Sequence, residues 1–196
     1  MNASETRVLE ERYTYGDYRK WDDGLRWELI DGEAFCMSPG PGAAHQGLLT
    51  KLVGNLFNYF DGKKCRIYVA PFDVMLPGGG EQDDEVDTVV QPDIMILCDM
   101  SKLRPNGIKG APDVVFEILS PSTAWRDFAE KLYLYERTGV KEYFLADPVN
   151  KIITAYRRGT DGLFSRRAAY NASSVLEFEN FPDLKIPLTP VFEDLY

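Results

Sequence analysis

The sequence has few cysteines, and their arrangement excludes two kinds of stabilised fold. Cys36, Cys65 and Cys98 are odd in number, far apart and without a CxxC pair. This spacing predicts neither a structural zinc site nor the disulfide framework of a small secreted protein. Each cysteine lies in or beside an expected strand, so we expect three reduced thiols packed in the core.

Long apolar runs are also missing. No stretch approaches the roughly 20 apolar residues that a membrane-spanning helix needs. The first 12 residues carry Glu5, Glu10 and Glu11 where a signal peptide would be hydrophobic. We therefore expect a cytoplasmic protein with no membrane partner.

A surplus of positive charge is lacking as well. The 22 Lys and Arg residues face 31 Asp and Glu residues, which gives a net charge of −9 at pH 7. Proteins that bind nucleic acid usually carry a basic surface that neutralises phosphates. Two interpretations remain. The protein has a phosphate-binding site whose negative charge is offset by a bound metal and local basic residues, or it does not bind nucleic acid.

What is present is the composition of a folded globule. Of the 196 residues, 44% are hydrophobic and 27% are charged, which is too apolar for a disordered chain. Domains typically have roughly 100 to 150 residues. We expect a single domain over residues 1–196, with its core at about 13–157 and short strands and irregular segments over 158–196.

The N-terminal segment predicts a short helix and then a β-hairpin. Tyr15, Tyr18 and Trp21 recur at helical spacing. Residues 26–37 place two β-prone runs around Asp31-Gly32, and a central Asp-Gly is a strong hairpin signal.

Helical and strand patterns then follow one another. Apolar residues spaced as on one helix face predict a helix over 43–60, and a cap and a closing glycine delimit a second over 124–138. Strands are expected at 66–76, 89–97, 114–119, 142–146 and 151–157. The runs at 89–97 and 114–119 are almost continuously apolar, so we expect both of their faces to be covered. The fold class is α/β (α+β).

One segment is strongly acidic. It contains Glu81, Asp83, Asp84, Glu85 and Asp87 but lacks the spaced oxygen pattern of a calcium loop. We expect a solvated, mobile loop here.

Two carboxylates occupy apolar strands. Asp93 begins one such strand, and Glu117 lies inside the next. A buried carboxylate is costly unless a cation, an ion-pair partner or a metal compensates it. If the two strands are neighbours, both side chains can converge on one hard cation, which could polarise a phosphodiester and activate water. We expect Asp93 and Glu117 to hold Mg²⁺ or Mn²⁺.

Further motifs place these carboxylates in a recognisable order. They are Tyr13-Thr14-Tyr15, the stretch from Glu28 to Glu33, Ser38-Pro39, His45, Ala70 to Val74, Gln91-Pro92-Asp93, Glu117 to Thr123, Lys131-Leu132 and Asp147-Pro148. Pro92-Asp93 followed by Glu117 resembles the PD-(D/E)XK nuclease superfamily. The whole set, from about Tyr13 to Arg157, resembles the Uma-Two family of restriction endonuclease-like proteins. The resemblance implies a central mixed sheet flanked by helices with an N-terminal helix and hairpin, an ion such as Mg²⁺, and cleavage of DNA.

The sequence departs from the superfamily pattern at one key position. A lysine normally follows the strand glutamate by two residues, but Leu119 stands there. Lys131 on the following helix is the candidate substitute, as in some members of the superfamily. The alternative is a surface ion pair with Asp127, four residues earlier, contributing about 0.3 to 0.5 kcal/mol.

His45, Asp73 and Glu33 complete the expected site. The first long helix lacks the glutamate often found there in the superfamily, and His45, near its start, is either a site residue or an ordinary helix-start residue. Glu33 or Glu28 could supply the absent carboxylate, although strand alternation leaves open which one points inward and each can be solvated. Asp73 either faces the same site or caps a bend.

The leading hypothesis is a metal-dependent DNA endonuclease, and a homodimer is expected by analogy with small nucleases that cut both strands. The alternative is a catalytically inactive interaction protein on a nuclease fold, which the acidic charge and Leu119 favour. An enzyme that uses the same metal site on another phosphate substrate is a third hypothesis.

Overall fold

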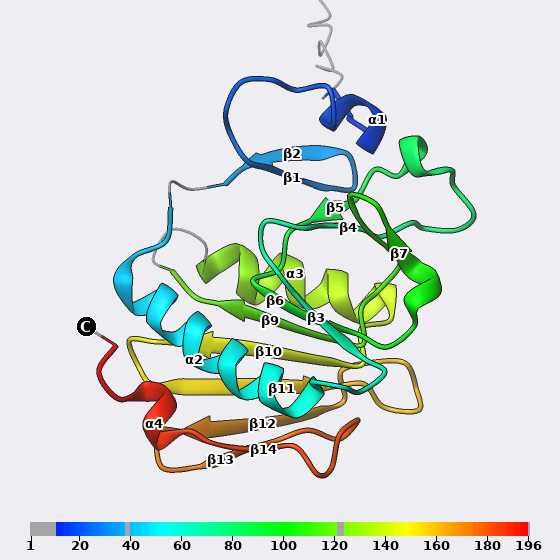
Figure 1. The fold of residues 1–196 in the computed structure, drawn as a ribbon. Helices are drawn as coiled ribbons and strands as arrows, with labels where there is room; N and C mark the ends of the chain where they lie inside the picture. The colour runs from blue at the N-terminus through cyan, green and yellow to red at the C-terminus, as the bar shows by residue number, and fades with distance from the viewer. Residues whose placement is uncertain (1–10, 38–39, 121–123, 196) are drawn as a thin grey trace, which may run out of the picture.

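A six-stranded mixed sheet forms the centre of the fold, with one long helix on each of its faces (Figure 1). The structure is a computed structural model that describes residues 11–37, 40–120 and 124–195, and the side chains of these residues apart from 124–129. The strand order is β12-β11-β10-β9-β6-β3. The bounds are β3 (Arg66–Val69), β6 (Ile94–Leu97), β9 (Val114–Ile118), β10 (Glu142–Asp147), β11 (Ile152–Arg157) and β12 (Arg166–Asn171).

Strand direction makes this sheet mixed, as the family resemblance implied. Strands β9 and β10 run parallel. The other neighbouring pairs in the sheet are antiparallel. The predicted fold class is confirmed.

The two long helices have the predicted bounds, α2 (Ala43–Phe60) and α3 (Ala124–Thr138). Helix α2 packs on the face of the sheet that includes Ile94 and Phe116. Helix α3 packs on the opposite face through Leu134 and Tyr135. Strands β6 and β9 are buried at every residue, which confirms that both of their faces are covered. Among the described residues, no helix has the length and apolar character to cross a membrane.

A second sheet lies over the α3 face and carries the N-terminal hairpin. Its order is β2-β1-β5-β4-β8-β7. The bounds are β1 (Trp27–Ile30), β2 (Glu33–Cys36), β4 (Asp73–Met75), β5 (Val89–Val90), β7 (Leu103–Arg104) and β8 (Gly107–Lys109). The predicted hairpin is confirmed, and its turn residues Asp31 and Gly32 both have positive φ, 50° and 83°. The short helix α1 (Tyr15–Tyr18) covers the other side of this sheet, where Tyr15 joins Leu29 and Met75.

The predicted continuous strands at 66–76 and 89–97 are wrong, because each run is divided between the two sheets. The first gives β3 and β4, and the second gives β5 and β6. Pro71 and Pro92 lie at the two breaks, and proline cannot donate a ladder hydrogen bond. The breaks leave Asp73 in the second sheet and Asp93 just before β6 of the central sheet.

The C-terminal segment is more ordered than predicted. Residues 166–171 form the edge strand β12, and β13 (Val175–Glu177), β14 (Lys185–Pro187) and α4 (Thr189–Phe192) follow. Buried side chains of this segment, including Leu176, Ile186 and Phe192, belong to the same core cluster as the apolar side of α2. The predicted short strands are present, but the segment packs into the core, which we expected at about 13–157.

The prediction of three reduced core thiols is also wrong. Cys65 and Cys98 form a disulfide, and Cys36 is a free thiol at an exposed position. The two bonded cysteines flank β3 and β6, where Arg66 pairs with Leu97, so the next step of the register brings them opposite each other. Because 33 residues separate the two cysteines in the chain, their pairing could not be predicted from the sequence.

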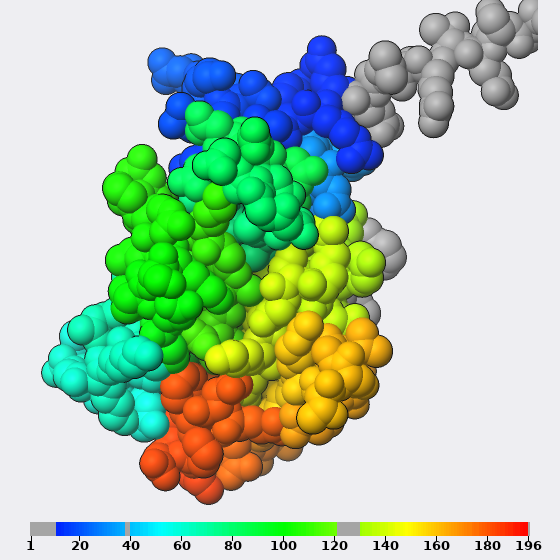
Figure 2. All heavy atoms as spheres, turned by 90° about the vertical axis from the view of Figure 1, so that its right-hand side faces the viewer, coloured from blue at the N-terminus to red at the C-terminus, as the bar shows by residue number. Residues whose placement is uncertain are grey.

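The acidic segment is tied to the rest of the protein rather than only solvated. Asp83 to Glu85 form a 3-10 turn, η1. Lys109 Nζ lies 2.8 Å from Asp83 Oδ1, and Arg19 Nη2 lies 3.0 Å from Asp84 Oδ2. The hydrogen bond from Lys109 holds the pKa of Asp83 below its ordinary value. In Figure 2 this segment lies between the N-terminal residues and the region of β7 and β8.

Candidate active site

Asp93 and Glu117 lie on neighbouring strands, as the sequence predicted. In the antiparallel pair of β6 and β9, Ile94 stands opposite Phe116. One further step along this register places Asp93 beside Glu117, at the end of the sheet where β6 begins. The two acids therefore come from adjoining strands of the central sheet.

Asp93 is held between the sheet and α2. Its Oδ2 accepts a 2.7 Å hydrogen bond from the backbone N–H of Ile118. The same oxygen lies 3.2 Å from His45 Nε2, and the Asp93 side chain is 20% exposed. His45 is in the first turn of α2, and its buried Nδ1 has no hydrogen-bond partner among the described residues. Asp93 is thus anchored through Oδ2 while it stays accessible.

Glu117 faces α3. Its Oε1 accepts hydrogen bonds from Lys131 Nζ at 2.9 Å and from the Tyr135 hydroxyl at 2.7 Å. Burial, and then the neighbouring charges of Glu117 and Glu28, raise the pKa of Tyr135 well above its ordinary value. The Tyr135 hydroxyl therefore stays protonated and can donate to Glu117.

Lys131 is buried, with 4% of its side chain exposed. Its Nζ also donates to Glu28 Oε1 at 2.9 Å, so the ammonium lies between two carboxylates. The alternative of a surface ion pair is wrong because Lys131 has almost no exposed surface. The side chain of Asp127 lies outside the described part of the chain, as do the motif residues 38–39 and 121–123.

The hairpin carboxylate that reaches Lys131 is Glu28. Glu28 is 1% exposed, and its Oε1 also accepts the backbone N–H of Gln91 at 2.8 Å. Glu33 stands opposite Ile30 and shares the face of Glu28, but β2 is the edge strand and Glu33 is exposed. Glu33 instead lines a shallow groove of about 220 Å³ between the hairpin and α3. Of the alternatives that the sequence left open for Glu28, the solvated one is therefore wrong.

Among the residues that the structure describes, Asp73 connects to this cluster through Gln91. Its Oδ1 accepts hydrogen bonds from Gln91 Nε2 at 2.8 Å and from the Tyr18 hydroxyl at 3.1 Å. Gln91 Oε1 accepts from Arg26 Nη2 at 2.6 Å. Burial raises the pKa of Asp73, and the hydrogen bonds from Gln91 and Tyr18 oppose that rise. Asp73 therefore contacts Gln91 and Tyr18 rather than the acidic pair itself.

Sequence reasoning missed Tyr135 and Gln91. Tyr135 follows Lys131 by four residues on a helix, so the two share a face, and this spacing could have identified it. Gln91 stands in the motif Gln91-Pro92-Asp93, but no role of its own could be predicted from the sequence, because its contacts depend on the division of one apolar run between two sheets.

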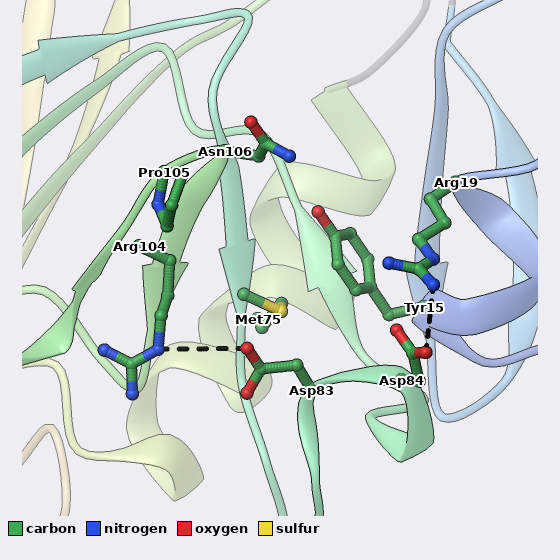
Figure 3. A pocket seen from close by; sticks show the side chains of 8 residues that line it. All are labelled: Tyr15, Arg19, Met75, Asp83, Asp84, Arg104, Pro105 and Asn106. Carbon is green, nitrogen blue, oxygen red and sulfur yellow. Dashed lines mark hydrogen bonds and ion pairs between the residues drawn. The ribbon is translucent and has the colours of Figure 1, made fainter.

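A second concavity, of about 160 Å³, contains none of the expected site residues. It lies between α1, the η1 turn and the turn joining β7 to β8, with Met75 and Tyr15 among its lining residues (Figure 3). Its arginines are paired with aspartates, Arg19 with Asp84 and Arg104 with Asp83. Tyr15 and Met75 belong to the small cluster under α1, whereas Tyr135 belongs to the α3 cluster, so this pocket is separate from the acidic pair.

The carboxylates of Asp93 and Glu117 are the type of donor that a hard divalent cation prefers. Asp93, Glu117 and Glu28 carry three negative charges, and Lys131 offsets one of them. Carboxylate oxygens and retained water are the usual ligands of Mg²⁺. No group of three or more His, Cys, Asp or Glu side chains in the described residues is arranged to hold a metal. A bound ion would therefore have two carboxylates and water as its ligands.

Comparisons with known proteins give the fold and the family. A crystal structure of a protein described as a putative nuclease, from Anabaena variabilis, superposes with a TM-score of 0.73 at 18% identity and covers 93% of this chain and 99% of that one. An uncharacterized protein from Synechocystis, slr1290, is 26% identical over 155 residues, which is 74% of each chain. A sequence model of the Uma2 family, described as "Putative restriction endonuclease", matches residues 15–189. Because this match spans most of the chain, the protein belongs to the Uma2 family.

Proposed function

We propose that this protein is a divalent-metal-dependent nuclease that hydrolyses phosphodiester bonds in DNA. The observation that carries the proposal is the placement of Asp93 and Glu117 at neighbouring positions of adjoining strands, with a buried lysine that donates to Glu117. Family membership and the nuclease-like fold support the same reaction class.

Asp93 and Glu117 would hold Mg²⁺ or Mn²⁺. A metal bound there supplies a Lewis acid for the scissile phosphate and lowers the pKa of the attacking water. The N–H of Ile118 and the ring of His45 orient Asp93, and the hydroxyl of Tyr135 orients Glu117. Orienting contacts of this kind fix how a carboxylate meets a metal.

Lys131 takes the place of the lysine missing at Leu119. Its ammonium reaches Glu117 from α3 instead of from the strand. There it stabilises negative charge that develops on the phosphate or holds the attacking water. Asp73 acts indirectly through Gln91, and Glu33 stays at the groove beside α3.

Cleavage of supercoiled plasmid in Mn²⁺ or Mg²⁺ tests the proposal. The wild-type protein should nick or cut the DNA, and Asp93→Ala and Glu117→Ala should each abolish cleavage while circular dichroism shows an intact fold. Asp31→Asn is the matched control, because Asp31 is an acidic hairpin residue in an exposed pair with Arg137 of α3. Cleavage that survives both alanine substitutions contradicts the proposal.

The acidic net charge favours a second candidate, an interaction protein that keeps the fold without the activity. Calorimetric titration with Mn²⁺ separates the two. A metal site should show one binding event that Asp93→Asn weakens strongly, whereas an inactive scaffold should bind Mn²⁺ weakly and without dependence on Asp93. Sedimentation of the same samples tests the homodimer that we propose for cutting both strands.

A further inference from the structure

A lysine that enters a site from a helix needs more than one anchor. The Lys131 side chain is a flexible four-carbon stem with a compact charge at its end. In the usual arrangement the lysine shares a strand face with the glutamate, but here Leu119 occupies that position and packs against the α3 cluster. The position of the Lys131 ammonium therefore depends on what it contacts.

Glu28 is the second anchor. Its carboxylate is buried and lies 2.9 Å from Lys131 Nζ, the same distance as the Glu117 carboxylate on the other side. Removing a charge partner from a buried pair is strongly unfavourable, so two carboxylates hold the ammonium more firmly than one.

Glu28 is itself fixed by a rigid neighbour. The N–H of Gln91 donates to the Glu28 oxygen that also receives Lys131. The Gln91 side chain is held in turn by Asp73, Tyr18 and Arg26. Gln91 precedes Asp93 by two residues, so one short segment carries both the support for the lysine clamp and the first metal carboxylate.

We propose that Glu28 is a positioning residue for Lys131 and not a metal ligand. The backbone N–H of Gln91 holds Glu28, and Glu28 holds the Lys131 ammonium against Glu117. When the lysine lies two residues after the glutamate, the strand itself fixes the position of the ammonium. The effect on catalysis rests on the proposed nuclease function, whereas the effect on the position of Lys131 does not.

Two variants test the catalytic part. Glu28→Ala should lower kcat by about 10- to 100-fold, the usual cost of losing an orienting partner. KM for DNA should stay unchanged, because Glu28 is buried away from solvent. Glu28→Gln keeps an oxygen that can accept from Lys131 and should recover part of the lost kcat. Asp31→Asn, which removes a charge from the same hairpin, should retain wild-type kcat.

Mn²⁺ binding separates positioning from ligation. Glu28→Ala should keep most of the Mn²⁺ affinity that Asp93→Asn loses. A loss in Glu28→Ala as large as that in Asp93→Asn would make Glu28 a ligand and overturn the proposal. Wild-type kcat in Glu28→Ala would overturn it as well.

Chemical acetylation followed by mass spectrometry gives a readout that needs no nuclease activity. Lys131 should be protected from acetylation in the wild-type protein and in Glu28→Gln, and it should lose this protection in Glu28→Ala. The exposed Lys20 serves as an internal reference, since 69% of its side chain is accessible. If wild-type protein cleaves no DNA but Lys131 loses protection in Glu28→Ala, the nuclease proposal fails and the positioning role stands. Unchanged protection in a folded Glu28→Ala protein rejects the positioning role.

Discussion

Asp73 is a buried carboxyl whose surroundings favour its neutral form. Burial raises its pKa, and the hydrogen bonds from Gln91 and Tyr18 only partly oppose that effect. The folded state therefore binds a proton more tightly at Asp73 than the unfolded state does. Stability must fall as pH rises from the ordinary carboxyl pKa to the raised pKa of the folded protein.

Asp73→Asn should remove this loss of stability at neutral pH. The asparagine oxygen can still accept from Gln91 Nε2 and Tyr18, but it carries no charge to desolvate. At pH 7 the variant should unfold at a higher temperature than wild type in calorimetry, and the difference should shrink as pH falls toward the ordinary carboxyl range.

Asp17→Asn is a control that should change the unfolding temperature at pH 7 in the opposite direction. Hydrogen bonds from the backbone and hydroxyl of Thr14 lower the pKa of Asp17, so its contribution is present above the ordinary carboxyl pKa and is lost as pH falls. Asp17→Asn should lower the unfolding temperature at pH 7 and have no effect in acid. A wild-type protein that is as stable as Asp73→Asn at pH 7 would contradict the assignment for Asp73.

At the residue scale, the sequence singled out the two acids of the proposed site more readily than the residues that contact them. Asp93 and Glu117 stood out because a carboxylate in an apolar run needs compensation, and Lys131 followed from the family pattern. The choice between Glu28 and Glu33 required the knowledge that β2 is the sheet edge. Alternation places both glutamates on one face, so it could not tell the buried residue from the exposed one.

At the scale of elements, local signals predicted the helices and the hairpin, while the sheets depended on contacts far apart in the chain. The bounds of α2 and α3 matched because helical spacing and end signals are local. The run at 66–76 looked like one strand because Pro71 was its only interruption, yet the chain changes sheets there. Sheet membership depends on partners that no local pattern contains.

The disulfide joins two such distant elements, β3 and β6, and its removal should weaken the fold. A link that closes a loop of 33 residues is worth about 3 to 4 kcal/mol on the chain-entropy estimate. Cys65→Ser should lower the free energy of unfolding by about that amount in urea titrations. Cys36→Ser should leave it unchanged, because Cys36 is exposed and unbonded.

A thiol assay checks the starting state of that experiment. The native protein should show one reactive thiol, Cys36, and three after reduction in denaturant. Three reactive thiols in the native protein, or equal stability of Cys65→Ser and wild type, would contradict the linkage of β3 and β6.

At the scale of the whole molecule, the predicted boundary between core and tail failed for a packing reason. The prolines of the C-terminal segment made it look irregular, but its alternating apolar residues complete the cover of the sheet face that α2 leaves open. Leu176, Ile186 and Phe192 are buried with Leu52 of α2 in one cluster. The core on the α2 side of the sheet is therefore built from α2, the central strands and the C-terminal segment together.

Net charge gives the last prediction. The chain carries a net charge of −9, and Asp93, Glu117, Glu28 and Lys131 together leave two negative charges where, under the proposed function, the phosphate would approach. DNA should bind poorly until a divalent cation cancels these charges. Fluorescence anisotropy at constant ionic strength should show an affinity at least about tenfold higher in Ca²⁺ than in EDTA, a difference of about 1.4 kcal/mol.

The double variant Asp93→Asn/Glu117→Gln separates the effect of the negative charge on DNA affinity from the effect of metal coordination. It removes two negative charges without removing the side chains, so in EDTA it should bind DNA more tightly than wild type does, and it should cleave none. Added Ca²⁺ should then change its affinity little, because the two carboxylates that we propose as metal ligands are gone. Equal DNA affinity of the wild-type protein in EDTA and in Ca²⁺ would show that phosphate does not approach this acidic pair, and the DNA substrate would have to be abandoned with it.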